Sequence, residues 1–394
     1  MQHDECRALP RPEPLSAEHS ARVADFLRRQ IAASGGSLSF AEFMQHALYA
    51  PGLGYYAAGA TKFGPQGDFV TAPEVSPLFG RIVARQCAEI LAGDSEGTIL
   101  EYGAGSGRLA RDLLRALAEL DALPARYDIL EVSADLQQRQ ADYLKSELPE
   151  LVDRVTWLDG PPQHHRGVIL ANEVLDALPV ERFRRGARNV RQVRVVVDGD
   201  GFAVAEAPAP EALSEAVMAV ESDLGERLPE GFVSEISLGL APWISQLAES
   251  LQRGVALLFD YGVSRREYYE ARRSGGWLRC HFRHHAHNNP LILPGIQDLT
   301  AWVDFTAVAE AALQSGLVVA GFATQAQFLL GGGLDTEMRD FGRLPLASQL
   351  ELSGQVKTLT LPGEMGEHFK CIALRRGDVS TPSAFQNADR THTL

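Results

Sequence analysis

The segment Ile99–Gly107 constrains the fold most, because it joins an apolar run to closely spaced glycines just ahead of a helix-forming stretch. This segment predicts a strand that contains Glu101 near its end. The strand is followed by a turn with glycines at every second residue, which are Gly103, Gly105 and Gly107. Glycine permits sharp turns and close approach of a ligand, and the helix predicted over 108–119 offers unpaired N–H groups at its start. The pattern is typical of a nucleotide-type pocket. A plain strand-to-helix connection is the simpler alternative.

The spacing of the glycines separates two classes of cofactor. The dinucleotide fingerprint is G-x-G-x-x-G and binds a pyrophosphate, whereas this turn has the form G-x-G-x-G. Glu101 lies just before the turn, where a carboxylate would repel a pyrophosphate but could accept a hydrogen bond from an ammonium group. These features favour S-adenosylmethionine over NAD.

A second acidic strand end follows the first. Residues 127–131 predict a strand that closes on Glu131. The α/β nucleotide folds place an acid that binds ribose hydroxyls about 20 residues after their glycines, which is roughly the separation found here. Glu131 is therefore predicted to bind the ribose, the alternative being an ordinary solvated acid.

Predicted strands and helices alternate from residue 98 onward, which is typical of a parallel sheet covered by helices. Strands are predicted over 98–102, 126–131, 154–158, 167–171 and 254–260, and late candidates over 317–328 and 369–375 complete a set of seven. We therefore expect an α/β fold with the doubly wound, seven-stranded sheet of a class I methyltransferase.

The chain is expected to divide into a core and added parts. Helical periodicity and hairpin signals predict a helical N-terminal lobe with a lid over 15–92 and an inserted, substrate-side subdomain over 178–253. The cofactor-binding core then comprises 93–177 and 254–376. The polar ends, 1–14 and 377–394, are predicted to be disordered.

Composition narrows the class of protein and of partner. The 394 residues are 45% hydrophobic and contain no apolar run near the roughly 20 residues that span a bilayer. The start carries acids and prolines, and the four cysteines lie far apart, so a cytoplasmic protein without a membrane span is expected. A net charge of −14 disfavours nucleic acid and favours a basic protein partner. The oligomeric state stays open.

Polar residues directly after the fourth predicted strand are candidates for the methyl-acceptor side, namely Asn172, Glu173 and Asp176. In open α/β sheets, ligands bind beyond the carboxyl ends of the strands. The alternative is that Asn172 caps a helix and the two acids complement its dipole.

Two loops complete the list of candidates. The first is predicted to close over the cofactor and to bind it through Gly67, Asp68, Phe69 and Thr71, although Thr71 could simply cap the next helix. The second carries four histidines over 281–287, but it has no interleaved acid or cysteine, so no metal site is predicted.

Five motifs in matching order resemble the MidA family of class I S-adenosylmethionine-dependent methyltransferases, a family that includes the mitochondrial assembly factor for respiratory complex I. The motifs are GDFVTAPE from Gly67, EYGAGSG from Glu101, ANEVLDALP from Ala171, DYG from Asp260 and PGIQDLTAWVDF from Pro294. The resemblance runs from about Tyr49 to Lys370. His281 departs from it, because the family usually has an aromatic residue there.

The resemblance implies methylation of an accessible protein arginine, with symmetric dimethylarginine as the product and a complex I subunit as the substrate in mitochondrial members. Carboxylates match the planar guanidinium, so Glu173 is expected to orient it, with Asp176 and Asn172 beside it. Two alternatives stay open, which are a non-catalytic assembly factor that binds S-adenosylmethionine and an NAD-dependent oxidoreductase.

Overall fold

The computed structural model describes residues 9–58 and 70–394 of the chain. They divide into two units, each of which collects distant segments of the sequence. The first unit comprises Met1–Val70, Leu178–Ser237 and Ala271–Ala301. The second comprises Thr71–Ala177, Leu238–Glu270 and Trp302–Leu394. The predicted residues 103–107, 131 and 172–176 all lie in the second unit.

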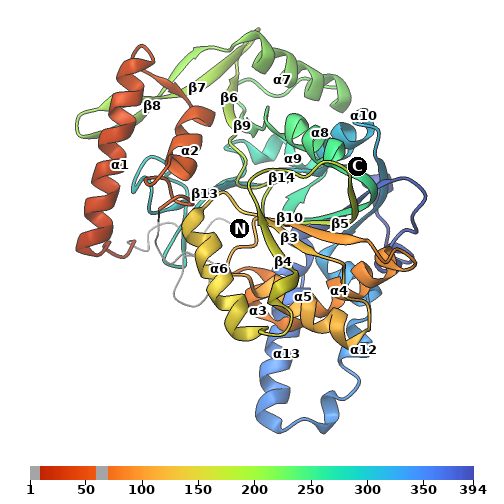
Figure 1. Ribbon diagram of the computed structural model, residues 1–394. Helices are drawn as coiled ribbons and strands as arrows, with labels where there is room; N and C mark the ends of the chain where they lie inside the picture. The colour runs from red at the N-terminus through yellow and green to blue at the C-terminus, as the bar shows by residue number, and fades with distance from the viewer. Residues whose placement is uncertain (1–8, 59–69) are drawn as a thin grey trace. The chain divides into compact units, whose positions relative to one another are not determined.

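The second unit is built on a mainly parallel sheet, as the alternation of strands and helices predicts (Figure 1). Seven strands follow one another in the order β15-β16-β10-β5-β2-β3-β4, and the short β14 pairs with β10. Their bounds are β2 Thr98–Tyr102, β3 Tyr127–Leu130, β4 Val155–Leu158, β5 His165–Asn172, β10 Leu251–Val263, β14 Val303–Asp304, β15 Val318–Thr324 and β16 Phe369–Arg376. Only β15–β16 and β16–β10 pair antiparallel within this path. The doubly wound α/β fold is confirmed.

The central strands are apolar along their length because helices cover both faces of such a sheet. Residues 255–259 of β10 and 168–171 of β5 are at most 2% exposed. The α-helices of this unit are α3 Ala72–Val75, α4 Pro77–Leu91, α5 Arg108–Glu119, α6 Ala134–Glu147, α8 Leu240–Ser250, α9 Arg265–Tyr268, α10 Phe305–Gln314, α11 Gln325–Gly331, α12 Leu334–Glu337, α13 Leu346–Thr360 and α14 Met365–His368. Helices α4 and α5 approach closely at Gly80, where an added Cβ would lie 2.6 Å from Cβ of Asp112.

The first unit contains antiparallel sheets. One has the order β1-β7-β6-β9 with β8 against β7, and the other has the order β12-β11-β13. The bounds are α1 Pro14–Ala33, β1 Leu38–Ser39, α2 Phe40–Tyr49, β6 Glu181–Arg185, β7 Val190–Asp198, β8 Gly201–Pro208, α7 Glu211–Leu224, β9 Val233–Ile236, β11 Leu278–Phe282, β12 His285–His287 and β13 Asp298–Ala301. The hairpin predicted around residues 198–201 is present between β7 and β8.

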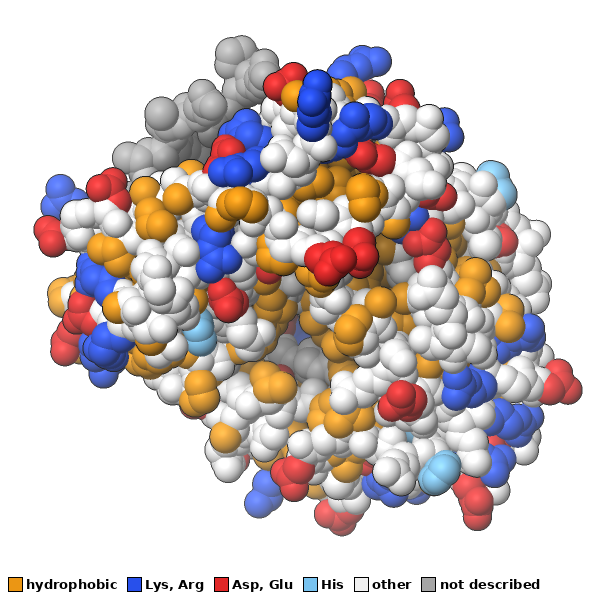
Figure 2. Space-filling view, turned by 90° about the horizontal axis from the view of Figure 1, so that it is seen from above, with side chains coloured by type: hydrophobic (Ala, Val, Ile, Leu, Met, Phe, Trp, Pro, Cys, Tyr) orange, Lys and Arg blue, Asp and Glu red, His pale blue; other side chains and the backbone are white. Residues whose placement is uncertain are grey.

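The arginines of β6 are paired with acids of their own unit. Arg182 binds Glu235 at 2.9 Å and Arg185 binds Glu221 at 2.6 Å. Acidic and basic side chains are also interspersed on the face of the molecule in Figure 2. In residues 9–58 and 70–394, no helix has the length and apolar character needed to cross a membrane.

The C-terminal residues differ from the sequence-based expectation. Residues 377–394 were predicted to be disordered, but Ala384 and Phe385 are at most 1% exposed. The backbone N–H of Ala384 donates to Oε1 of Gln86, and Phe385 packs against Phe328. Apolar side chains in a polar tail can thus anchor it to the core, which the average polarity of the segment conceals.

Candidate functional site

The parallel strands bring the predicted residues to one edge of the second unit's sheet. Glu101 lies near the end of β2, Glu131 directly follows β3, and Asn172 ends β5. Strand β2 pairs with both β3 and β5, so these three carboxyl ends are neighbours. In folds of this class, ligands bind at this edge.

The glycine turn, residues 103–107, is held in a conformation that favours glycine. Gly103, Gly105 and Gly107 have φ angles of 65°, 55° and 82°, in the left-handed region. Gly107 is the N-cap of α5 and supplies no side-chain cap to the helix. The turn therefore leaves the first backbone N–H groups of α5 without a side-chain cap, which is the arrangement that binds an anionic or polar ligand.

Glu101 is a buried acid with no ion-pair partner in the described part of the chain. The residue is 2% exposed, and its Oε2 accepts a hydrogen bond of 2.7 Å from the Tyr127 hydroxyl. Burial raises the pKa of Glu101 to about 7, the Tyr127 hydrogen bond lowers it, and the charge of Glu131 raises it. A cation beside Glu101 would favour its ionised form.

Glu131 is oriented through both of its carboxylate oxygens. Oε1 accepts a hydrogen bond of 3.0 Å from the backbone N–H of Ser133, and Oε2 accepts one of 3.2 Å from Nε2 of Gln140. The residue is 7% exposed. A carboxylate can accept several hydrogen bonds at once, so Glu131 is a candidate to bind ligand hydroxyls.

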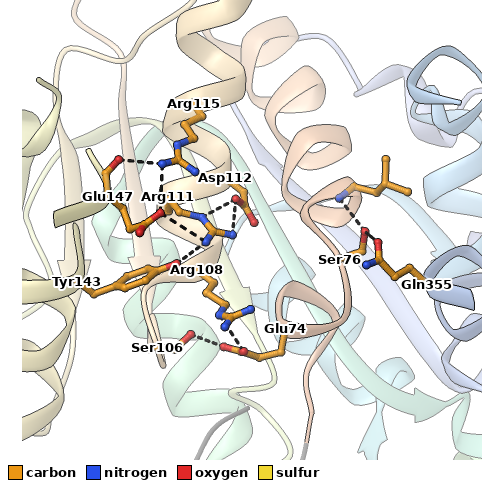
Figure 3. Close-up of polar contacts among 11 residues, drawn as sticks. Glu74, Ser76, Ser106, Arg108, Arg111, Asp112, Arg115, Tyr143, Glu147 and Gln355 are labelled. Carbon is orange, nitrogen blue, oxygen red and sulfur yellow. Dashed lines mark hydrogen bonds and ion pairs between the residues drawn. The ribbon is translucent and has the colours of Figure 1, made fainter. Parts of the chain in front are cut away.

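The predicted loop ahead of α3 is described only from residue 70. Gly67, Asp68 and Phe69 lie outside the described residues. Thr71 is the N-cap of α3 but makes no side-chain capping hydrogen bond. Glu74 of α3 instead reaches the glycine turn, where its carboxylate accepts a hydrogen bond from the Ser106 hydroxyl and pairs with Nε of Arg108 at 3.0 Å (Figure 3).

The last residue of β5 and the four irregular residues that follow it, Asn172–Asp176, are called the acidic loop below. No helix starts there, so the alternative of a capped helix is wrong for this described segment. Glu173 has φ 54°, a left-handed conformation that is uncommon for a residue with a side chain. The N–H of Glu173 donates to the carbonyl of Phe259 at 2.8 Å, and Nδ2 of Asn172 donates to Oε1 of Glu173 at 3.2 Å.

Asp260 fixes the acidic loop from the neighbouring strand β10. Its Oδ2 accepts hydrogen bonds from the N–H groups of Leu175 and Asp176, at 2.9 and 3.2 Å. Its Oδ1 accepts another from the N–H of Tyr261 at 2.9 Å. Burial raises the pKa of Asp260 well above its usual range, and the negative charges of Asp176 and Glu173 raise it further.

The acidic loop holds more acceptors than donors. Burial raises the pKa of Asp176 to about 6, against the hydrogen bonds from the Tyr261 hydroxyl and from nearby backbone N–H groups. Asn172 Oδ1 and Asp176 Oδ1 are buried without a hydrogen-bond partner in the described part of the chain. Buried oxygens of this kind are normally paired, so a donor with positive charge is the complementary ligand.

Sequence reasoning missed three residues that position this site. Asp260 and Glu74 appeared only as members of the DYG and GDFVTAPE motifs, without a role of their own, and Gln140 was not singled out. A strand-end position is a usable signal for Asp260. Glu74 and Gln140 lie within helices, where only tertiary contacts disclose their partners.

The histidines of the predicted loop lie in the first unit. His281 is on β11, and His285 and His287 are on β12. Burial lowers the pKa of His281 to about 4, with His287 and Arg279 acting in the same direction. Within the two described ranges, no cluster of His, Cys, Asp or Glu residues could hold a metal ion.

Comparison with known proteins gives consistent matches. Residues 82–323 match the model of a family described as "Putative S-adenosyl-L-methionine-dependent methyltransferase". A Drosophila melanogaster relative named "Protein arginine methyltransferase NDUFAF7 homolog, mitochondrial" is 31% identical, covering 93% of this chain and 89% of the relative. The human protein arginine methyltransferase NDUFAF7, mitochondrial, is 29% identical over 86% of this chain and 80% of that protein.

The solved structure of a likely methyl transferase from Burkholderia thailandensis, bound to S-adenosyl-homocysteine, is 38% identical in sequence to this chain and superposes on it with a TM-score of 0.92. The match covers 98% of this chain and 100% of the chain in that structure.

The comparisons also correct one expectation. The predicted cytoplasmic location is wrong, because the animal relatives are named as mitochondrial proteins. Folded proteins of the cytoplasm and of the mitochondrion have similar amino-acid compositions, so composition could not indicate the location.

Proposed function

Because the chain belongs to the family of S-adenosyl-L-methionine-dependent methyltransferases that its residues 82–323 match, we propose that it methylates a guanidinium nitrogen of arginine in a protein. One observation carries the proposal, which is that Asn172 and Asp176 of the acidic loop each have a buried oxygen without a hydrogen-bond partner among residues 9–58 and 70–394. They lie at the same sheet edge as the cofactor-binding turn. A guanidinium brings five N–H donors and a positive charge, and so supplies what this loop lacks.

The residues around the glycine turn fit S-adenosylmethionine. The open start of α5 and the glycine backbone suit the polar end of the cofactor, buried Glu101 suits its ammonium group, and oriented Glu131 suits two ribose hydroxyls. Thr71, with Gly67, Asp68 and Phe69, is proposed to contact the cofactor from the preceding loop. When bound, the cofactor supplies an electrophilic methyl group on a sulfonium.

The acidic loop is proposed to hold and aim the acceptor. Glu173 would accept two parallel hydrogen bonds from the guanidinium, with Asn172 fixing the Glu173 carboxylate through their 3.2 Å contact. One nitrogen then faces the methyl group in line with the sulfur, so that the new N–C bond forms as the C–S bond breaks. The sulfur keeps the electron pair of the broken bond.

The methylated nitrogen must lose a proton, and Asp176 is proposed to accept it. Its pKa of about 6 lies near neutral pH, which is the range in which a carboxylate serves as a general base. Glu173 stays ionised in this scheme and stabilises the positive charge as it moves onto the acceptor.

The substrate is proposed to be a protein. The relatives named as protein arginine methyltransferases support arginine in a protein, and the resemblance to the MidA family supports a complex I subunit as the acceptor. The chain's net charge of −14 is compatible with a partner that presents basic residues.

The test uses the purified full-length protein, S-adenosylmethionine with an isotope-labelled methyl group, and a lysate of cells that lack the enzyme. Mass spectrometry should detect the label on arginine in proteins, and it should not detect it when Glu173→Gln replaces the wild type. Label on lysine or on a small molecule would contradict arginine as the acceptor. Cofactor binding without any label would favour the non-catalytic alternative.

A further inference from the structure

Gln140 of α6 connects three parts of the cofactor side. Its Nε2 donates to the carbonyl of Gly105 at 3.0 Å and to Oε2 of Glu131 at 3.2 Å. Its Oε1 accepts a hydrogen bond of 2.9 Å from the indole N–H of Trp157. The residue is 0% exposed. Both amide hydrogens and the amide oxygen are thus used, and each partner belongs to a different element of the second unit.

The partners determine which way the amide faces. The indole N–H of Trp157 can only donate, so it must meet the amide oxygen. The carbonyl of Gly105 can only accept, so it must meet the amide nitrogen, which also donates to Oε2 of Glu131. A flipped amide would oppose like groups at all three contacts. The donors and acceptors of these partners therefore fix the orientation of the Gln140 amide.

Helix α6 is held in place by contacts outside this cluster. Arg111 of α5 donates to the Tyr143 hydroxyl of α6, and Arg115 of α5 pairs with Glu147 of α6 at 3.1 Å (Figure 3). An added Cβ at Gly107 would lie 3.8 Å from Cα of Gln140, so the glycine turn packs directly on the α6 backbone. Gln140 therefore projects from a helix whose position relative to the turn is fixed.

We propose that Gln140 is a positioning residue that sets the spacing between the glycine turn and Glu131, and thereby gives the site its preference for a ribose with both hydroxyls. The inference rests on the proposed binding of S-adenosylmethionine at this edge. One amide holds the carbonyl in the middle of the turn and the carboxylate that meets the ribose. The two halves of the cofactor site are thus kept in register before the ligand arrives.

No other side chain of similar size serves all three partners. Glutamate would place a second carboxylate against Glu131 and lose both N–H donors. Leucine or methionine would leave the Gly105 carbonyl, the Glu131 oxygen and the Trp157 indole N–H buried without this partner. A change at Gln140 should therefore act through Glu131 on the ribose, and not only on the stability of the fold.

The test measures binding of S-adenosylhomocysteine and of its 2′-deoxyribose analogue to the full chain by calorimetry. The wild type should bind the deoxy analogue at least about tenfold more weakly, since a hydroxyl bonded to a carboxylate is lost. In Gln140→Leu the affinity for S-adenosylhomocysteine should fall about tenfold, and the preference over the deoxy analogue should shrink to two- or threefold.

Three further variants complete the design. Gln138→Leu is the matched control, because Gln138 lies on the same helix with an exposed side chain that contacts only Asp142 in the contacts described, and it should change neither affinity. Trp157→Phe removes one of the three hydrogen bonds and should give an intermediate loss. Gln140→Glu keeps the size of the side chain and should reproduce the loss of preference if the leucine variant does not fold.

The outcomes separate this inference from the proposed function. Equal losses of affinity for both ligands in the folded variants, with the preference unchanged, would overturn the positioning role while leaving cofactor binding intact. If the wild type binds neither S-adenosylmethionine nor S-adenosylhomocysteine, the proposed function itself fails. A reduced preference in Gln140→Leu with an unaltered Gln138→Leu supports the inference.

Discussion

The glycine turn after β2 and the acidic loop after β5 leave neighbouring parallel strands, yet their polar groups are satisfied in different ways. On the cofactor side, Glu131 and the Gly105 carbonyl already have partners in the amide of Gln140. On the acceptor side, Asn172 Oδ1 and Asp176 Oδ1 are buried without partners in the described residues. The comparison supports the proposal that the cofactor side is organised before binding, whereas the acceptor side needs a cationic substrate to supply its missing donors.

The two sides also differ in how charge is placed. Near the turn, Glu101 has an acidic neighbour in Glu131 and accepts a hydrogen bond from Tyr127. In the acidic loop, burial raises the pKa of both Asp176 and Asp260, and Asp176 and Glu173 raise that of Asp260 further. Accumulated negative charge in a buried place costs stability unless a cation balances it. We therefore expect substitutions on the two sides to affect different steps.

The largest expected effect is on the acceptor side. Glu173→Gln keeps the size of the side chain but removes the charge that holds and stabilises the guanidinium, so methyl transfer should fall a hundredfold or more. The affinity for S-adenosylmethionine should stay within twofold. Transfer rates and calorimetry on the same preparation measure both, with the exposed Glu150→Gln as a control. A loss of cofactor affinity of similar size would mean that the two sides are not separable.

Next in size is a change in the glycine turn. Gly105 has φ 55°, and a branched side chain there costs roughly 1–2 kcal/mol in backbone strain and occupies the ligand's place. Gly105→Val should weaken cofactor binding about a hundredfold without unfolding the protein. Gly160→Val is the control, since Gly160 has open space around its Cβ position. Unchanged affinity in Gly105→Val would mean that the cofactor binds elsewhere.

A change at Asp260 tests whether the acidic loop needs its support from β10. Its two carboxylate oxygens accept three backbone N–H groups, and an amide can accept on only one oxygen. Asp260→Asn should lower kcat about tenfold, because the loop is less well held, with little change in the affinity for the cofactor. A variant with normal kcat would show that these contacts serve stability alone, which thermal unfolding would report separately.

The pKa of Glu101 gives a pH dependence on the cofactor side. Because that pKa is raised to about 7, Glu101 is largely protonated at pH 5.5 and becomes ionised as the pH rises to 7. An ammonium group prefers the ionised form, so cofactor affinity should rise with pH, by up to about tenfold per unit below the pKa. The cofactor's amino group stays protonated over this pH range, because an α-amino group titrates at higher pH. Calorimetry at several pH values measures the cofactor affinity of the wild type and of Glu101→Gln. The affinity of the glutamine variant should not rise with pH in this range.

The smallest expected effect belongs to Glu74. Glu74→Gln loses the ion pair with Arg108 but can keep the contact with the Ser106 hydroxyl. Cofactor affinity should fall about two- to fivefold, because the Arg108 side of the pair is partly exposed to solvent. A change of a hundredfold would place Glu74 in direct contact with the ligand.

The sequence indicated the sheet and its binding edge because these depend on local patterns. Apolar runs such as 255–259 are typical of strands buried on both faces, and Glu101, Glu131 and Asn172 mark strand ends that adjacent pairing brings together. The left-handed glycines follow from their own spacing. These features require no knowledge of distant contacts.

The remaining features depend on contacts between distant segments. Gln140 and Trp157 meet only because β4 lies beside β3, and Glu74 meets Ser106 only because α3 lies against the start of α5. The order of the C-terminal tail rests on the buried side chains of Ala384 and Phe385 and on polar contacts such as the hydrogen bond from the N–H of Phe322 to Asp389. The roles of the predicted site residues themselves remain predictions until they are measured.

A crystal structure of the full chain with S-adenosylhomocysteine tests the central claim most directly. The account predicts the ribose hydroxyls within hydrogen-bond distance of Glu131, the amino group beside Glu101, and the sulfur directed toward Glu173 and Asp176. Density for the nucleoside at another edge of the sheet, or a ribose that does not contact Glu131, would contradict it.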